Sequence, residues 1–126
     1  MRPKTLVDVA QLTSSGDSFD RSLANFLDEF YFAPNAAALA DAPELLAPRF
    51  GETGQVQDAY LAATAEKLAG DNHFAIPAWT TADTRKLHRP WFASPLAALR
   101  AVLLLESPAA FRARNLFISE NALTRA

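Results

Sequence analysis

The stretch that decides the fold is DSFDRSLANFLDEFYFAP, residues 17–34. Its large apolar side chains recur at the three- and four-residue spacing that places them on one face of an α-helix. They are Phe19, Leu23, Phe26, Leu27 and Phe30. Asp17 or Ser18 is suited to cap the N-terminus of this helix, and Pro34 ends it because the residue before a proline avoids helical geometry. We therefore predict one amphipathic helix between Ser18 and Pro34.

Helix-favouring residues continue on both sides of this stretch. Alanine and leucine dominate the chain and β-branched residues are few, which favours helix over strand almost everywhere. We expect a shorter helix over residues 5–14, helical turns within 35–41 and 43–47, and a helix over 54–70 with Gly70 as its C-cap. The apolar groups of the 54–70 helix fall on more than one face, which predicts that it lies between two neighbours.

The last third of the chain predicts three further helical segments. SPLAALRAVLLLE, residues 94–106, starts with the Ser-Pro pair of a helix N-terminus and is apolar nearly all round, which predicts a central buried helix. Short helices are expected within 107–115 and 119–126. The tail should then pack back onto helix 95–106. The whole pattern predicts an all-α fold, a compact single domain over residues 1–126 with about five to seven helices, several of them short.

Composition limits the class of protein. A chain of 126 residues, half of them hydrophobic and 21% charged, suits one globular domain with its own core. Cysteine is absent, which excludes disulfides, thiol catalysis and cysteine-based zinc sites. The longest apolar run, residues 96–106, is too short to span a bilayer, and Asp8 interrupts the apolar N-terminal stretch. A cytoplasmic protein is the expectation.

Charge is distributed unevenly along the chain. Residues 1–84 carry five Lys/Arg against twelve Asp/Glu, a net −7, whereas residues 85–126 carry seven Lys/Arg against two Asp/Glu, a net +5. Such polarity can guide a charged partner to one end of a molecule. The alternative is that the two halves attract each other within one fold.

No residue pattern indicates an enzyme. The candidates for acid–base or metal chemistry are His73 and His88 with nearby Asp71 and Asp83, which match no metal-binding motif. The four glycines form neither a P-loop nor a dinucleotide fingerprint, and there is no nucleophile elbow. A hydrolytic triad from distant residues stays open, because its members need not be neighbours in sequence. We expect no catalytic activity, no metal and no cofactor.

Aromatic residues and prolines cluster at IPAWT (76–80) and RPWFASP (89–95). Large aromatic side chains beside proline can form a ligand groove or a protein-binding hot spot. Alternatively, Trp79, Trp91 and Phe92 fill the core where helices do not cover it. Arg89 could add a cation–π contact to Trp91 under either interpretation.

The C-terminal segment 107–126 resembles a helix-turn-helix in outline, with two short helices and a turn. Its last helix offers only Asn121, Thr124 and Arg125 as polar contacts, which are too few for base readout. The sequence pI near 5.6 predicts weak nonspecific binding. A weak DNA-binding accessory role is therefore a lesser alternative, and binding of nucleic acid by this chain alone is not expected.

Four stretches together resemble a family of small bacterial helical proteins: FLDEFY (26–31), YLAATAEKLA (60–69), IPAWT (76–80) and residues 89–126. Members of that family occur as free-standing domains or after a helix-turn-helix in bacterial regulators, and some lie beside genes for nucleotidyltransferase-like toxins. The resemblance covers residues 19–126 and is strongest over the last forty. It implies an all-helical domain in a toxin–antitoxin or transcription-regulation context and no catalytic residues.

Two functional hypotheses follow. In the first, the chain is a protein-binding module, antitoxin-like or regulator-associated, that contacts a toxin or a regulator through its basic, aromatic C-terminal half; a homodimer is also compatible. Its arginines would reach acidic groups while Phe111 and other aromatic side chains anchor the partner. The candidate partner-binding residues are Arg89, Trp91, Phe92, Arg112, Arg114, Phe117 and Arg125. In the second, the chain is an effector domain that senses a small molecule in a pocket near Trp79 and Trp91.

Overall fold

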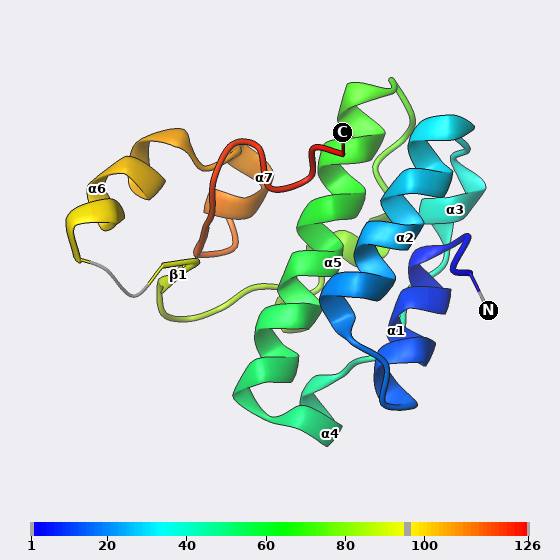
Figure 1. Cartoon of the computed structure of the whole chain (residues 1–126), viewed down its shortest axis with the longest axis horizontal. Helices are drawn as coiled ribbons and strands as arrows, with labels where there is room; N and C mark the ends of the chain where they lie inside the picture. Colours follow the sequence, from blue (N-terminus) through cyan, green and yellow to red (C-terminus); the bar gives the residue numbers. More distant parts are fainter. Residues whose placement is uncertain (1, 95–96, 126) are drawn as a thin grey trace.

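The computed structural model describes residues 2–94 and 97–125, and the predicted all-α fold is confirmed. In chain order the α-helices of the described residues are α1 (Leu6–Ser14), α2 (Phe19–Phe32), α3 (Ala37–Ala40), α4 (Ala47–Phe50), α5 (Glu52–Asp71), α6 (Ala97–Glu106) and α7 (Ala109–Arg112). Two 3₁₀ turns, η1 (Ala78–Thr81) and η2 (Asp83–Arg85), and two strands, β1 (Trp91–Phe92) and β2 (Leu116–Phe117), complete the chain. Figure 1 shows α1, α2 and α5 packed as a bundle, with α6 at the opposite end of the molecule.

The first two helices form an antiparallel hairpin whose ends match the sequence signals. Thr5 and Asp8 make a reciprocal capping box at the N-terminus of α1, which satisfies two backbone amides that a helix start leaves unpaired. The Ser18 side chain accepts the Arg21 amide at the start of α2. The apolar stripe of α2 is buried as predicted, except for Phe19, which is half-buried. Gly16 supplies a positive φ of 109° in the turn between the helices.

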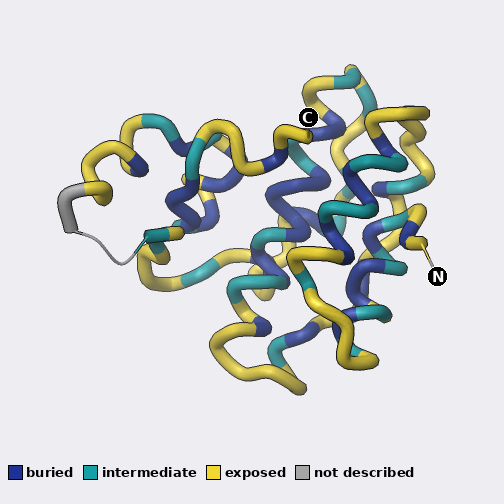
Figure 2. Tube along the Cα trace, in the orientation of Figure 1, coloured by how far each residue is buried: buried dark blue, intermediate teal, exposed yellow. Residues whose placement is uncertain are grey.

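Helix α5 is the centre of the fold, and Figure 2 shows it buried along most of its length. It contacts α4, α7, both 3₁₀ turns and β2, which confirms that it lies between neighbours. It runs for twenty residues, longer than predicted, and Gly70 lies inside it while Asn72 is the C-cap. At Gly54 the helix passes so close to the preceding segment that a Cβ atom there would lie 2.4 Å from the Leu46 carbonyl oxygen.

A buried acidic residue of α5 holds the segment that leads into α4. The Asp58 carboxylate accepts the backbone amides of Leu46 at 2.7 Å and Ala47 at 3.0 Å. Arg85 Nη1 lies 3.8 Å from Asp58 Oδ1, and Arg85 Nη2 donates to the Pro43 carbonyl. Burial raises the pKa of Asp58, an effect that the two amide hydrogen bonds and then Arg85 partly oppose. Burial likewise lowers the pKa of Arg85.

The C-terminal segment departs from the predicted helices. β1 and β2 pair in parallel, with Trp91 opposite Leu116 and Phe92 opposite Phe117, although no alternating pattern marks either strand. After β2 the chain forms a turn at 120–123, so the helix predicted within 119–126 is absent from the described residues. The tail then crosses to α2, where the Tyr31 hydroxyl donates to the Leu123 carbonyl at 2.8 Å. Since β2 also contacts α5, the tail packs on the bundle as well as on α6.

Candidate functional site

The predicted patch of arginines is mostly used inside the fold. Arg114 is buried: it donates to the carbonyls of Ala110 at 2.7 Å and Thr80 at 2.9 Å, and pairs with Glu66 at 3.3 Å. The prediction that Arg114 reaches acidic groups of a partner is therefore wrong. Arg125 is exposed, but its Nε donates to Asp28 Oδ1 at 2.9 Å.

These pairs account for much of the uneven charge along the chain. Arg85 with Asp58, Arg114 with Glu66 and Arg125 with Asp28 each join the basic last third to the acidic remainder. The alternative that the two halves attract each other is thus confirmed for these three arginines. Arg89 and Arg112 are exposed, and no ion pair reaches either of them within residues 2–94 and 97–125.

The predicted aromatic anchors divide into two groups. Phe111 is fully buried against Tyr60, with ring centroids 4.9 Å apart, and Phe117 is buried and stacked on Phe92 at 5.1 Å. These rings hold the C-terminal segment together and are not free to meet a partner. Trp91 is 37% exposed and is the predicted anchor that remains open to solvent.

Trp79 is half-buried and packs against the core, which agrees with the alternative interpretation of the aromatic cluster for this residue. Its indole Nε1 donates to the Leu39 carbonyl at 3.0 Å, and its ring packs against the hydrophobic core. The Arg85 guanidinium lies 4.9 Å from the Trp79 ring centroid. The described residues do not form the predicted cation–π contact between Arg89 and Trp91. The neighbouring ring, that of Phe92, instead has the Arg100 guanidinium over it, 5.1 Å from the ring centroid.

The predicted position of helix α6 is wrong. It was predicted to be central and buried, yet it contacts the rest of the fold chiefly through β2 and buries Leu103 alone among its large side chains. Among the residues of α6 whose exposure the structure describes, the four opposite Leu103 span an arc of about 160° at 100° per residue, and they are apolar and exposed. They are Ala101, Val102, Leu104 and Leu105, called here the outward face of α6.

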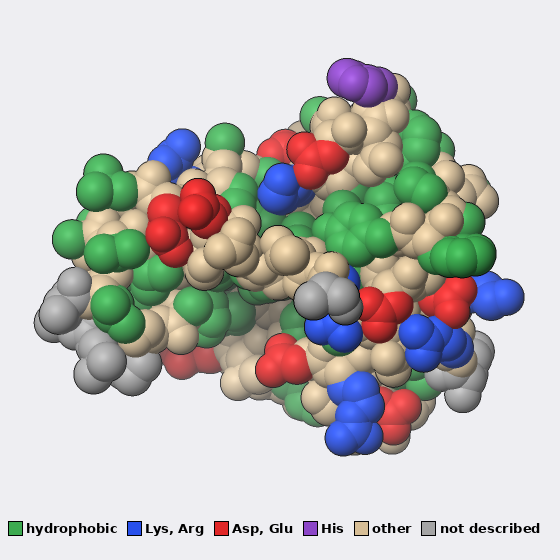
Figure 3. Space-filling view, turned by 45° about the horizontal axis from the view of Figure 1, so that its top comes forward, with side chains coloured by type: hydrophobic (Ala, Val, Ile, Leu, Met, Phe, Trp, Pro, Cys, Tyr) green, Lys and Arg blue, Asp and Glu red, His purple; other side chains and the backbone are tan. Residues whose placement is uncertain are grey.

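The outward face of α6 is unusual for a surface helix. Leu105 is 83% exposed, and Val102 and Leu104 are each 46% exposed. Figure 3 shows hydrophobic side chains gathered on the surface at the end of the molecule where α6 lies. Contiguous apolar surface of this kind marks an interaction site more often than a single exposed leucine does. An all-round apolar sequence predicts burial, but it does not say whether the chain's own core or another molecule covers the helix.

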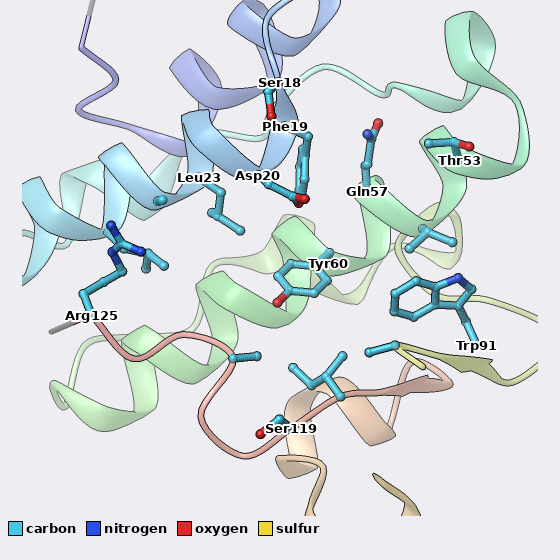
Figure 4. A pocket seen from close by; sticks show the side chains of 16 residues that line it. Ser18, Phe19, Asp20, Leu23, Thr53, Gln57, Tyr60, Trp91, Ser119 and Arg125 are labelled. Atoms are coloured by element: carbon cyan, nitrogen blue, oxygen red, sulfur yellow. The ribbon is translucent and has the colours of Figure 1, made fainter. Parts of the chain in front are cut away.

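A groove of about 740 Å³ lies between α2, α5, β1 and the C-terminal segment, and we call it the α2–α5 groove (Figure 4). Its walls are mainly apolar and include three aromatic rings, of Phe19, Tyr60 and Trp91. Asp20, Gln57 and the other polar lining residues lie among them; these are Ser18, Thr53, Ser119 and Arg125. The pocket predicted near both tryptophans is thus lined by Trp91 and not by Trp79.

Asp20 and Arg125 are the charged residues in the lining of the α2–α5 groove. Arg125 is paired with Asp28, whereas no ion pair reaches Asp20 in the part of the chain that the structure describes. Burial, with a smaller contribution from Asp20, raises the pKa of Tyr60 to about 12. The carboxylate field of Asp20 therefore extends to the phenol in the groove wall.

His73 and His88 were the candidates for metal binding. His73 and His88 are both exposed, and within residues 2–94 and 97–125 no three His, Cys, Asp or Glu side chains come together around a common point. His73 has a positive φ of 58° in the turn after α5.

Within residues 2–94 and 97–125, none of the helices is both long and apolar enough to cross a membrane. The chain matches no protein-family model, and neither a curated protein nor a solved structure shows significant similarity to it.

Proposed function

We propose that this chain is a non-enzymatic, cytoplasmic protein-binding module that presents α6 to an apolar groove, rimmed by acidic side chains, on a partner protein. The observation that carries the proposal is the outward face of α6, whose four apolar residues face solvent, with Leu105 83% exposed. Fully burying one leucine side chain contributes about 1.5–3 kcal/mol. Covering this face would therefore be a large part of the free energy of binding.

A groove on another protein suits α6 better than a second α6 does. The helix has ten residues and is about 15 Å long. A stable interface buries about 800 Å² on each partner, more than two short helices lying side by side can cover. A groove contacts both flanks of the outward face at once, as in other complexes in which an amphipathic helix lies in a hydrophobic groove.

Charge favours an acidic rim on the partner. Arg100 borders the outward face of α6 on one side and Glu106 on the other, and Arg112, in the next helix, is exposed without an ion pair among the described residues. Acidic side chains on a partner protein would be attracted to Arg100 and would speed association.

The interface therefore includes part of the predicted patch and adds a helix to it. Arg112, exposed in the helix after α6, stays in the proposed contact, whereas Arg114 and Phe117 are buried. Arg89 lies in a hollow beside Glu52 and Thr53 of α5. The family resemblance would make the partner a toxin or a transcriptional regulator. That assignment is part of the proposal, and identifying the partner tests it.

Site-specific photo-crosslinking in the native host tests the proposal. A benzoylphenylalanine at position 105 should give one predominant product, formed with a protein other than this chain. The same group at position 32 should not give that product, because Phe32 is 89% exposed but lies on α2. The purified partner should then bind the native chain, and Leu105→Glu should weaken its affinity at least about tenfold, or 1.4 kcal/mol.

Two controls separate binding from folding. Leu105→Glu should leave the thermal midpoint unchanged, because the side chain is already in water, and Phe32→Glu should leave the affinity unchanged. A crosslink between two copies of this chain would refute the heterologous partner. Equal affinities for the native chain and Leu105→Glu would refute α6 as the contact.

A further inference from the structure

The α2–α5 groove has the size and lining of a small-molecule site. Its volume of about 740 Å³ falls within the range of about 300–1,000 Å³ that is typical of ligand pockets. Contacts between the surrounding elements fix its walls. Phe19 of α2 packs edge-on against Tyr60 of α5, with ring centroids 6.0 Å apart, and the Tyr31 hydroxyl of α2 donates to the Leu123 carbonyl of the tail. Figure 4 shows side chains from α2, α5, β1 and the tail around one space.

The aromatic rings in the walls favour a cation. Phe19, Tyr60 and Trp91 come from three different elements, α2, α5 and β1, and surround the same groove. The face of an aromatic ring attracts an ammonium group, and removal of water strengthens the attraction. The rings also offer apolar area on which the body of a ligand can pack.

The polar groups of the groove favour the same ligand class. Asp20 supplies a carboxylate that no ion pair of the described residues neutralises, whereas the Arg125 charge is matched by Asp28. Gln57 forms part of the wall, and its buried Oε1 has no hydrogen-bond partner in the part of the chain that the structure describes. Rotation of the Gln57 amide would bring this acceptor to an N–H donor in the groove.

We propose that the α2–α5 groove binds a small protonated amine with an apolar or aromatic body, with the ammonium group near Asp20 and Gln57 and the body against Phe19, Tyr60 and Trp91. The site is separate from the outward face of α6, so it stands whether or not α6 binds a partner.

Amide and indole NMR spectra of the full chain test the proposal, with phenethylamine and n-hexylamine as probes and 2-phenylethanol as the uncharged counterpart. Both amines should shift the resonances of Gln57, Tyr60 and the Trp91 indole. The resonance of the Trp79 indole, which donates a hydrogen bond to the Leu39 carbonyl, should not shift. The alcohol should bind at least about tenfold more weakly than phenethylamine, because it lacks the charge.

Three variants locate the site. Asp20→Asn should weaken amine binding about tenfold or more, because it removes the carboxylate. Asp17→Asn makes the same charge change three residues away, outside the groove lining, and should weaken binding much less than Asp20→Asn does, because the Asp17 carboxylate does not line the groove. Gln57→Leu should weaken binding several-fold yet raise the thermal midpoint, since it removes a buried oxygen without a partner.

Three results would overturn the proposal. One is equal affinity for phenethylamine and 2-phenylethanol, which would make the groove a purely apolar surface. Another is the same loss of affinity in Asp17→Asn as in Asp20→Asn. The third is the absence of shifts from both amines up to about 10 mM, above the range of weak but specific binding.

Discussion

Replacing Asp58 with asparagine should destabilise the fold strongly. The Asp58 side chain is 1% exposed and faces three groups: the amides of Leu46 and Ala47 and the guanidinium of Arg85. Asparagine keeps one acceptor oxygen, but it places an NH₂ group where the second oxygen was and leaves the Arg85 charge without a counter-ion. Removing one partner of a buried ion pair costs about 3–5 kcal/mol. Single domains have about 5–15 kcal/mol of stability in total.

Urea unfolding followed by far-ultraviolet circular dichroism measures this loss. The urea midpoint should fall by the lost free energy of unfolding, about 3–5 kcal/mol, divided by the m-value, about 1–3 kcal/mol/M for a small domain. The m-value itself should not change. Arg85→Met tests the charge separately, because methionine keeps apolar contact with the Trp79 ring on which Arg85 stacks. The loss in the Asp58→Asn/Arg85→Met double variant should be smaller than the sum of the two single losses, since the two side chains share one interaction.

Asp28→Asn is the matched control. Asp28 also pairs with arginines, Arg2 and Arg125, but at the surface, where ion pairs contribute little. Its unfolding midpoint should stay close to that of the native chain. A loss below about 1 kcal/mol in Asp58→Asn would refute the reasoning, because the buried pair would then behave like an exposed one.

Two further predictions concern α5. Gly54→Ala should lower the free energy of unfolding by about 1–3 kcal/mol, because the new Cβ would meet the Leu46 carbonyl. Gly70→Ala should raise the free energy of unfolding by about 0.5–1 kcal/mol, because Gly70 has open space around it and alanine favours a helix. If urea unfolding shows shifts of the same sign for both variants, the close approach at Gly54 is contradicted. The pKa of Tyr60 is about 12 in the folded chain, against about 10 when the chain is unfolded. Between these two pH values the unfolded state releases a proton that the folded state keeps. The free energy of unfolding should therefore fall by about 2–3 kcal/mol from pH ~10 to ~12. Ultraviolet titration of the phenols checks the pKa, and Tyr60→Phe should flatten that part of the stability profile; an ordinary tyrosine titration would contradict it.

The first two helices could be predicted from sequence because local signals settle them. The spacing of Phe26 and Phe30 sets the buried face of α2, and Ser18 caps this helix as expected. Such signals act within a few residues, so no distant contact is needed to interpret them. The central position of α5 was also predictable, because its apolar residues point in several directions.

The rest of the site could not be predicted because it depends on distant partners. Arg112 and Arg114 look alike in sequence, but only Arg114 reaches Glu66, forty-eight residues away, and is buried. The apolar pattern of α6 is the pattern of a core helix, and its exposure follows from how β2 and α7 hold it away from α5. Likewise, the α2–α5 groove exists because Phe19, Trp91 and the tail meet only in three dimensions.

The path of the last residues has a consequence for how the protein matures. One wall of the α2–α5 groove consists of Ile118, Ser119, Ala122 and Arg125, and Leu123 is anchored to α2 across more than ninety residues of chain. During synthesis, α1 to α5 emerge from the ribosome and can assemble first. The tail side of the groove is missing until residue 125 has also emerged, so a nascent chain that has exposed only α1 to α5 would hold a formed bundle and an unfinished binding site.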